Sequence, residues 1–229
     1  MRCWKNGKTI RLPETQLPDY AKIKKAMLAN QGRYHRNTFI FDYDPSPILE
    51  ALCQGIEVNM KKDYHFFATP PEGCDFILQA ARPMGQRVLE PSAGHGALAQ
   101  AIIEFAQGNT VDCVELHPVN RNVLKKKGFN LVGKDFLDFQ PTELYDRVIA
   151  NPPFKDYHDH FWHMLECVKP GGDVWLYVPA SIEFKQDKKT ARIREYLEKH
   201  DGEILNVPQG TFKSSGTMVN TRIIGATRP

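Results

Sequence analysis

Segments with strand-like and helix-like patterns alternate along residues 87–226, and this alternation limits the fold more than any other feature. Helical repeats, such as Leu98, Ile102 and Phe105, separate short runs of aliphatic residues. Consecutive strands that are joined by helices form parallel sheets covered on both faces. We therefore predict an α/β fold with an open, mostly parallel sheet, whose strands we place at 87–89, 111–116, 147–150, 173–178, 203–207 and 221–226.

The first 60 residues follow a different pattern. A polar stretch interrupted by prolines precedes a predicted helix over 19–29, a strand over 38–41 and a second helix that starts at Ile48. We interpret residues 1–60 as a small accessory α+β segment and residues 61–229 as the main domain.

Composition narrows the class of protein further. The chain has 229 residues, of which 41% are hydrophobic, and this is enough for a sizeable core. Its five cysteines form no CxxC pair, so we expect neither a disulfide framework nor a metal site. This use of cysteine suits a reducing compartment, and we expect a cytoplasmic location. We find no signal peptide and no apolar run near the ~18 residues of a membrane span. The net charge of +3 neither requires nor excludes a nucleic-acid partner.

A glycine-containing turn, Gly94-His95-Gly96, joins the first strand of the main domain to a helix. Glycine lets the backbone approach a ligand closely, and the helix N-terminus offers free N–H groups. Roughly 20 residues later Glu115 ends the next strand, where a carboxylate can accept hydrogen bonds from both ribose hydroxyls. The turn also fits an NAD site or a tight packing turn, but Glu90 would repel a pyrophosphate and suits a cationic amino-acid group better.

The segment Asn151-Pro152-Pro153-Phe154 follows another predicted strand, at the sheet edge that holds ligands in open α/β folds. The Asn151 side-chain carbonyl and the Pro152 backbone carbonyl can accept hydrogen bonds from the two N–H groups of an exocyclic amine. The prolines stiffen this loop, and Phe154 offers a face on which a base can stack. The residue types favour chemistry at a base amino group over a rigid turn with a core phenylalanine.

These motifs together resemble those of class I S-adenosylmethionine-dependent methyltransferases, and within them the adenine-N6 DNA methyltransferases. The resemblance spans about residues 60–225, and the first 60 residues are similar to the leader of small phage and plasmid methylases. It implies a Rossmann-like, seven-stranded, mostly parallel sheet and S-adenosylmethionine as cofactor. We find no long insert that would form a separate target-recognition domain.

The resemblance also implies roles for individual residues. Phe67, Thr69 and Pro70 would contact the methionine part of the cofactor, as in the family's F-x-T-P element. The catalytic loop would be Asn151, Pro152, Pro153 and Phe154. The remaining cofactor contacts would come from the glycine loop, the ribose position and the segment around the cofactor's adenine, namely Glu90, Pro91, Ser92, Ala93, Gly94, Gly96, Glu115, Leu116, Asp135 and Phe136, with Asn151 beside them.

The expected partner is DNA, whose target base must leave the stack to react. Phosphate contacts would offset that cost. The candidates are Lys155 beside the catalytic loop and Lys185, Lys188 and Lys189 in a loop after a later strand. His158, His160 and His163 follow the catalytic motif, and we expect structural or surface roles for them.

Several other functions compete with this interpretation. An RNA methyltransferase acting on guanine N2 or adenine N6 fits the same motif, and a protein glutamine-N5 methyltransferase fits less well because such enzymes usually have Tyr at the position of Phe154. A cytosine-C5 methyltransferase needs a Pro-Cys nucleophile, and no cysteine here follows a proline. A binding module that keeps the fold without catalysis is disfavoured by the intact Asn151 and Phe154.

Overall fold

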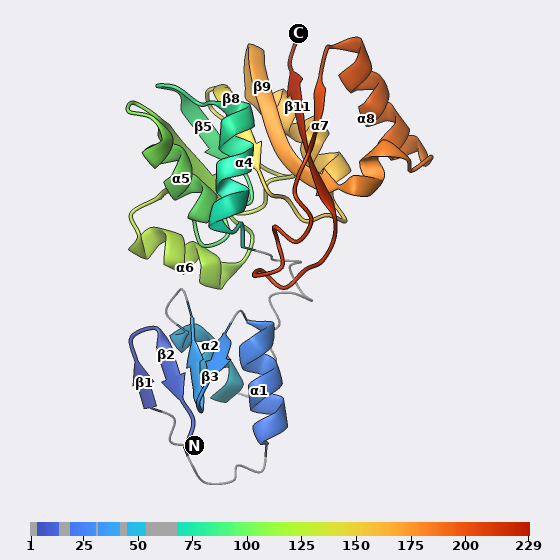
Figure 1. Cartoon of the computed structure of the whole chain (residues 1–229). Helices are drawn as coiled ribbons and strands as arrows, with labels where there is room; N and C mark the ends of the chain where they lie inside the picture. Colours follow the sequence, from blue (N-terminus) through green and yellow to red (C-terminus); the bar gives the residue numbers. More distant parts are fainter. Residues whose placement is uncertain (1–3, 14–18, 31, 42–44, 54–67) are drawn as a thin grey trace. The chain divides into compact units, whose positions relative to one another are not determined.

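The computed structural model describes residues 4–13, 19–30, 32–41, 45–53 and 68–229. The chain forms two compact units, Met1–Phe66 and Phe67–Pro229, which we describe separately. Figure 1 draws the first unit in blue and the second in green to red. The boundary predicted near residue 60 and the candidate site residue Phe67 both lie outside the described residues.

The first unit contains a four-stranded antiparallel sheet with the strand order β1-β2-β4-β3. Ile10 and Phe39 are fully buried on one face of this sheet, and the helices contribute Met27 and Ile48 to the same core. Sequence analysis identified β4 and both helices but missed three strands, because each has only three residues and shows no alternation long enough to recognise. The elements are β1 (Trp4–Asn6), β2 (Thr9–Arg11), α1 (Tyr20–Ala29), β3 (Arg33–His35), β4 (Thr38–Ile40) and α2 (Ser46–Cys53).

The second unit contains a seven-stranded sheet with the order β10-β11-β9-β8-β5-β6-β7, in which β11 alone runs against its neighbours. The mostly parallel seven-stranded sheet that the sequence predicted is therefore confirmed. Its strands are β5 (Arg87–Glu90), β6 (Thr110–Val114), β7 (Asn130–Gly133), β8 (Tyr145–Ala150), β9 (Val168–Pro179), β10 (Glu203–Asn206) and β11 (Thr221–Thr227).

Helices cover both faces of this sheet (Figure 1). Side chains of α4, α5 and α6 pack with Val88, Cys113 and Tyr177 on one face. Side chains of α7 and α8 pack with Leu89 and Val148 on the other. The helices are α4 (Pro71–Ala81), α5 (Ala97–Phe105), α6 (Pro118–Lys126), α7 (Tyr157–Cys167) and α8 (Lys188–Lys199), with a short 3-10 helix η1 (Ala180–Glu183) after β9. Among the described residues, none of the helices is long and apolar enough to span a bilayer.

A partly buried ion pair fixes the centre of the sheet. Arg147 on β8 donates through Nη2 to Asp173 Oδ2 on β9 at 2.6 Å, and its Nη1 donates to the Ala81 carbonyl at the end of α4. The Arg147 guanidinium therefore joins the two central strands β8 and β9 to α4. This link fixes the position of α4, which follows Pro70, relative to β8, which precedes Asn151.

Candidate active site

The candidate site lies where the direction of chain progression across the sheet changes. β5 is flanked by β6 on one side and by β8 on the other, and all three strands are parallel. The crevice beyond the carboxyl ends of such strands is the usual ligand site of open α/β sheets. The turn 91–96, Glu115 and the loop 151–154 follow β5, β6 and β8 respectively, so all of them lie at this edge.

The glycine turn after β5 requires glycine at its last position. Gly94 and Gly96 have φ of 56° and 81°, in the left-handed region that side chains disfavour. A Cβ on Gly96 would lie 2.5 Å from the Phe129 ring and 2.9 Å from Leu124. The turn is therefore held tightly against α6 and the chain that follows it, with its backbone at the ligand edge.

Glu115 is buried and organises the turn. Its Oε2 accepts a hydrogen bond from Gly94 N at 2.7 Å, and its Oε1 accepts from His117 N at 2.7 Å and from Asn120 Nδ2 at 3.2 Å. Burial raises the pKa of Glu115 to about 7, although these hydrogen bonds oppose the shift. Each carboxylate oxygen has two lone pairs, so Oε2 can still accept a hydrogen bond from a ligand.

Glu90 at the end of β5 is only 2% exposed. Its Oε2 has no hydrogen-bond partner among the residues that the structure describes. Burial is the largest cause that raises the pKa of Glu90 well above its usual value, and nearby Glu115 raises it further. A backbone hydrogen bond with Ala99 opposes this shift but leaves Oε2 unsatisfied. A buried charged group with an unsatisfied oxygen is costly, and an adjacent cation would stabilise its charged form. This carboxylate thus fits the cationic end of a ligand better than an anionic one.

The catalytic-motif residue Asn151 lies beside Thr69, although 82 positions separate them in the chain. Asn151 Nδ2 donates to Thr69 Oγ1 at 3.2 Å, and Thr69 is itself buried. Ser215, in the segment before β11, donates to the Ala68 carbonyl at 2.6 Å. Three distant segments therefore meet beside the loop 151–154.

The loop 151–154 is rigidly seated. Pro152 is buried, and Pro153 and Phe154 are half-buried. Phe154 packs against the core cluster that α4 and α5 share, so one part of its ring is held while another part stays accessible.

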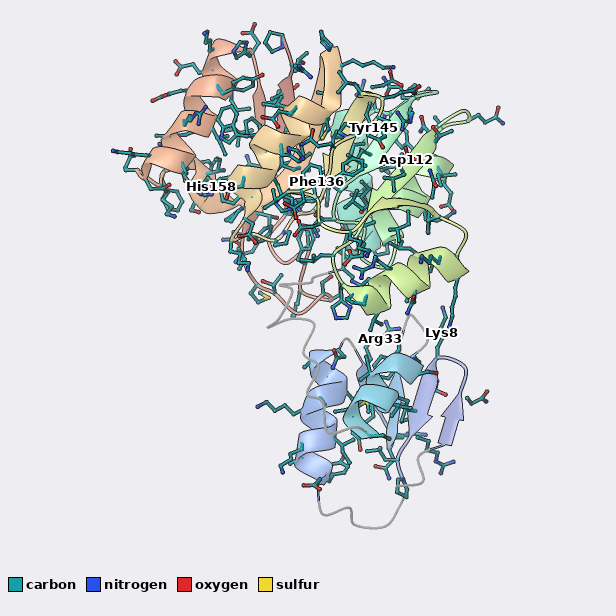
Figure 2. All side chains as sticks on the ribbon, turned by 180° about the vertical axis from the view of Figure 1, so that it is seen from behind. Lys8, Arg33, Asp112, Phe136, Tyr145 and His158 are labelled. Atoms are coloured by element: carbon teal, nitrogen blue, oxygen red, sulfur yellow. The ribbon has the colours of Figure 1, made fainter. Side chains whose placement is uncertain are left out.

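The segment after β7 supplies both polar and apolar groups. Asp135 is half-buried and accepts a hydrogen bond from Leu137 N at 3.0 Å. Phe136 is 3% exposed, and its ring centroid lies 4.7 Å from that of His163 and 5.3 Å from that of His160. Figure 2 shows Phe136 within the second unit, and its buried ring belongs to a core cluster, so it does not offer an open face. Leu137 in this segment is 43% exposed, and Leu116, which follows β6, is 51% exposed. Sequence analysis missed Leu137 because a single exposed leucine carries no pattern.

The candidate phosphate-binding lysines are exposed, but three of the four pair with nearby acids. Lys155 Nζ lies 3.6 Å from Asp156, Lys185 Nζ lies 3.3 Å from Asp187, and Lys189 Nζ lies 3.1 Å from Asp159. The prediction that Lys188 and Lys189 belong to a loop is wrong. They form the first turn of α8, which begins at Lys188. The helix begins there because the Asp187 side chain accepts a hydrogen bond from Thr190 N and caps the N-terminus.

The three histidines of α7 make contacts within the protein. His158 Nε2 lies 2.9 Å from Thr190 Oγ1, His160 Nδ1 lies 3.1 Å from the Asp156 carbonyl, and His163 Nε2 lies 2.7 Å from the Phe139 carbonyl. Within the described ranges, no cluster of His, Cys, Asp and Glu is arranged to hold a metal ion.

An exposed apolar group lies at the same edge of the sheet. Ala180 N donates to the Asn220 carbonyl at 2.8 Å, which joins the chain after β9 to the chain before β11. Phe184, Met218 and Val219 flank this link and are 67%, 60% and 48% exposed. Sequence analysis did not identify them, because their common location depends on the antiparallel pairing of β9 with β11.

Comparisons with known proteins agree with this fold. No protein-family model matches the chain. A curated tRNA1(Val) (adenine(37)-N6)-methyltransferase from Aliivibrio salmonicida is 30% identical over 77 residues, which cover 30% of this chain and 33% of that protein. The match therefore spans about a third of the relative's length.

Solved structures match over more of the chain. The M protein of the type I restriction enzyme EcoKI superposes with a TM-score of 0.61 at 17% identity, covering 92% of this chain and 55% of that chain. The 23S rRNA methyltransferase ErmE superposes with a TM-score of 0.55 at 18% identity, covering 72% and 70%. At the level of the fold, these similarities confirm the resemblance that the sequence motifs indicated.

Proposed function

We propose that this chain, which has the fold of class I S-adenosylmethionine-dependent methyltransferases, transfers a methyl group to the N6 amino group of adenine in DNA. The observation that carries the proposal is the position of Asn151-Pro152-Pro153-Phe154 at the carboxyl end of β8, next to the turn after β5, with Asn151 hydrogen-bonded to Thr69. The motif proposed to bind the methyl donor and the motif proposed to bind the acceptor base therefore lie side by side at the carboxyl edge of the sheet.

The residues present fit S-adenosylmethionine. The buried Glu90 carboxylate, whose Oε2 has no partner among the described residues, suits the cationic end of the cofactor. Glu115 Oε2 can accept a hydrogen bond from a ribose hydroxyl. Gly94 and Gly96 allow close approach of the backbone. The other proposed contacts are Phe67, Thr69, Pro70, Pro91, Ser92, Ala93, Leu116, Asp135, Phe136 and Asn151. When bound, the cofactor supplies an electrophilic methyl group.

The chain's own residues prepare the acceptor amine. The lone pair of an exocyclic amine is delocalised into the base, so the amine is a weak nucleophile. The Asn151 side-chain carbonyl and the Pro152 backbone carbonyl accept hydrogen bonds from the two N–H groups of the amine. These hydrogen bonds favour a nitrogen lone pair that is directed at the methyl group. Phe154 stacks on the flipped base, a contact of about 1–3 kcal/mol. Transfer is a direct displacement without a covalent enzyme intermediate.

Nucleoside mass spectrometry tests the proposal. The chain is incubated with isotopically labelled S-adenosylmethionine and, in separate reactions, duplex DNA, RNA and a protein mixture. We expect labelled N6-methyladenine in DNA, and about 10²–10³-fold less label per unit time with Asn151→Ala. Label in RNA or protein only, from a preparation that binds the cofactor, would contradict the DNA assignment.

A second candidate is an RNA adenine-N6 methyltransferase. The observation that favours it is the 30% identity to a tRNA adenine-N6 methyltransferase over 77 residues. The same residues would act on the same amine, so the two candidates differ only in the polymer. The RNA reaction above separates them, since labelled N6-methyladenosine without labelled DNA is the result that the second candidate requires.

A further inference from the structure

Positive charge is unevenly divided between the two units. Residues 1–66 contain 11 Lys and Arg against 7 Asp and Glu, whereas residues 67–229 contain 19 against 20. The second unit thus carries no excess cation. A polyanionic substrate gains most of its non-specific affinity from cations, so the first unit is the better source of them.

One face of the small sheet presents these cations to solvent. Strand alternation and cross-strand register put Ile10, Phe39 and Tyr34 on the inner face, towards the helices. The opposite face carries Arg11, Thr38 and His35 in one row across three strands. Arg33 belongs to the next row of that face, two residues or about 7 Å along β3.

The two hairpin turns extend this face at its ends. Lys8 lies in the β1–β2 turn, next to the row that contains Arg33, and Figure 2 shows both side chains at one end of the unit. Arg36 lies in the β3–β4 turn, directly after His35. We call the exposed residues Lys8, Arg11, Arg33, His35 and Arg36 the basic face.

Arg36 occupies a backbone conformation that suits glycine or asparagine. Arg36 and Asn37 have φ of 42° and 60°, as in the tight hairpin turns that prefer such residues at both central positions. A bulky side chain in the left-handed region is strained by about 1–2 kcal/mol. Arginine therefore gains no backbone stability at this position, and glycine would fit the same conformation without strain.

We propose that the basic face binds the phosphate backbone of duplex DNA and supplies affinity that the second unit lacks. The inference rests on the proposed function for the identity of the polymer, whereas charge complementarity supports only an anionic partner. Arginine suits this role, since its planar guanidinium binds phosphate through two parallel hydrogen bonds. These contacts are independent of base sequence.

Arg36→Gly is the sharpest test, because it should move two measurements in opposite directions. Glycine fits the φ at this position, so thermal stability should be unchanged or higher. Binding of a fluorescent DNA duplex to the full chain without cofactor should weaken, and the plot of log affinity against log salt should lose about 0.9 of its slope. A purely structural Arg36 would leave DNA affinity unchanged.

A charge-matched pair of double variants separates this face from general electrostatics. Arg11→Gln with Arg33→Gln should weaken duplex binding by at least about tenfold and reduce the salt slope by about 1.8. Lys22→Gln with Lys25→Gln removes the same charge from exposed positions on α1 and should change binding by less than about threefold. Arg11→Lys with Arg33→Lys should restore most of the affinity, and this controls for folding.

Three outcomes would overturn the inference: equal losses in both Gln variants, wild-type binding by Arg11→Gln with Arg33→Gln, or a loss confined to an RNA hairpin probe. Failure of the proposed function has a different signature. If the chain binds duplex DNA through the basic face but does not methylate it, the surface assignment stands and the reaction assignment fails.

Discussion

Glu115 connects the glycine turn to the proposed ribose site, so a single substitution tests that site. Glu115→Ala removes an acceptor that we expect to bind ribose hydroxyls, and charge-assisted hydrogen bonds of this kind contribute about 1.5–3 kcal/mol. S-adenosylmethionine affinity measured by calorimetry should therefore fall by roughly one to two orders of magnitude. Glu104→Ala, on the exposed side of α5, should bind normally. Equal affinities for the two variants would refute the ribose assignment.

The raised pKa of Glu115 also predicts how stability depends on pH. The folded protein keeps this proton up to about pH 7, whereas the unfolded chain releases it near the ordinary value of 4.5. The folded state thus binds more protons between these values, and the free energy of unfolding of the cofactor-free protein should fall as pH rises through this range. A decrease of about 2–3 kcal/mol is expected from urea unfolding at pH 4.5 and pH 8.

Glu115→Gln is the control for this dependence, because glutamine cannot titrate. It should remove most of the decrease, leaving the part that Glu90 contributes through the same burial. A full decrease in the variant would assign the pH dependence to other groups.

Asn151→Ala addresses the reaction step. The side-chain carbonyl is needed mainly in the transition state, so turnover should drop by about 10²–10³-fold while cofactor affinity changes little. Asn122→Ala, at an exposed position of α6, is the matched control and should keep full activity. Near-normal turnover of Asn151→Ala, measured with saturating cofactor and DNA, would make the residue structural.

At the scale of elements, the Arg147–Asp173 pair joins β8 to β9 and to the end of α4. Removing only Arg147 leaves a largely buried carboxylate without its partner, so Arg147→Ala should destabilise the fold by about 3 kcal/mol. The double variant Arg147→Ala with Asp173→Ala should lose less than the sum of the two single variants. Chemical unfolding of all four proteins measures this coupling, and strict additivity would show that the pair contributes nothing.

How far the sequence predicts these elements depends on their length and burial. Strands of the main sheet are recognisable because each central strand is a run of aliphatic residues buried on both faces. β7 and β10 lie at the edges with four residues each, and β1 to β3 are shorter still, so only β10 was identified among these five strands. The start of α8 was placed too late, because its first turn consists of lysines that carry no apolar periodicity.

The sequence suggests the individual residues of the candidate site but not which of its segments lie close together in space. Gly94, Glu115 and Asn151 follow from residue types at strand ends, which a sequence displays directly. The contact between Asn151 and Thr69 depends on how α4 packs beside β9, where Tyr177 donates to the Gly73 carbonyl at 2.6 Å. Such packing brings together residues that are about a hundred positions apart in the chain. A single sequence does not indicate which of these distant residues will be in contact.

The whole molecule divides its tasks between the two units. The second unit has short connections at the ligand edge, and the longest joins β10 to β11 over residues 207–220. Base-specific recognition needs several side chains that reach base edges, and each good bidentate contact discriminates by only about 1–3 kcal/mol. The basic face adds affinity for the backbone, which is independent of sequence.

We therefore predict a short or relaxed target, in the extreme a single adenine with weak preferences for its neighbours. The segment 207–220 is held to the site through Ser215 and Ala68, so it can contact at most the bases next to the target. Genomic DNA methylated by the purified chain and sequenced for N6-methyladenine should show a motif of about two to four base pairs. Replacing Met218 and Val219, which are exposed beside the site, should alter the neighbour preference without abolishing transfer. A strict motif of six or more base pairs would contradict this prediction, because the contacts available at this edge cannot supply that much discrimination.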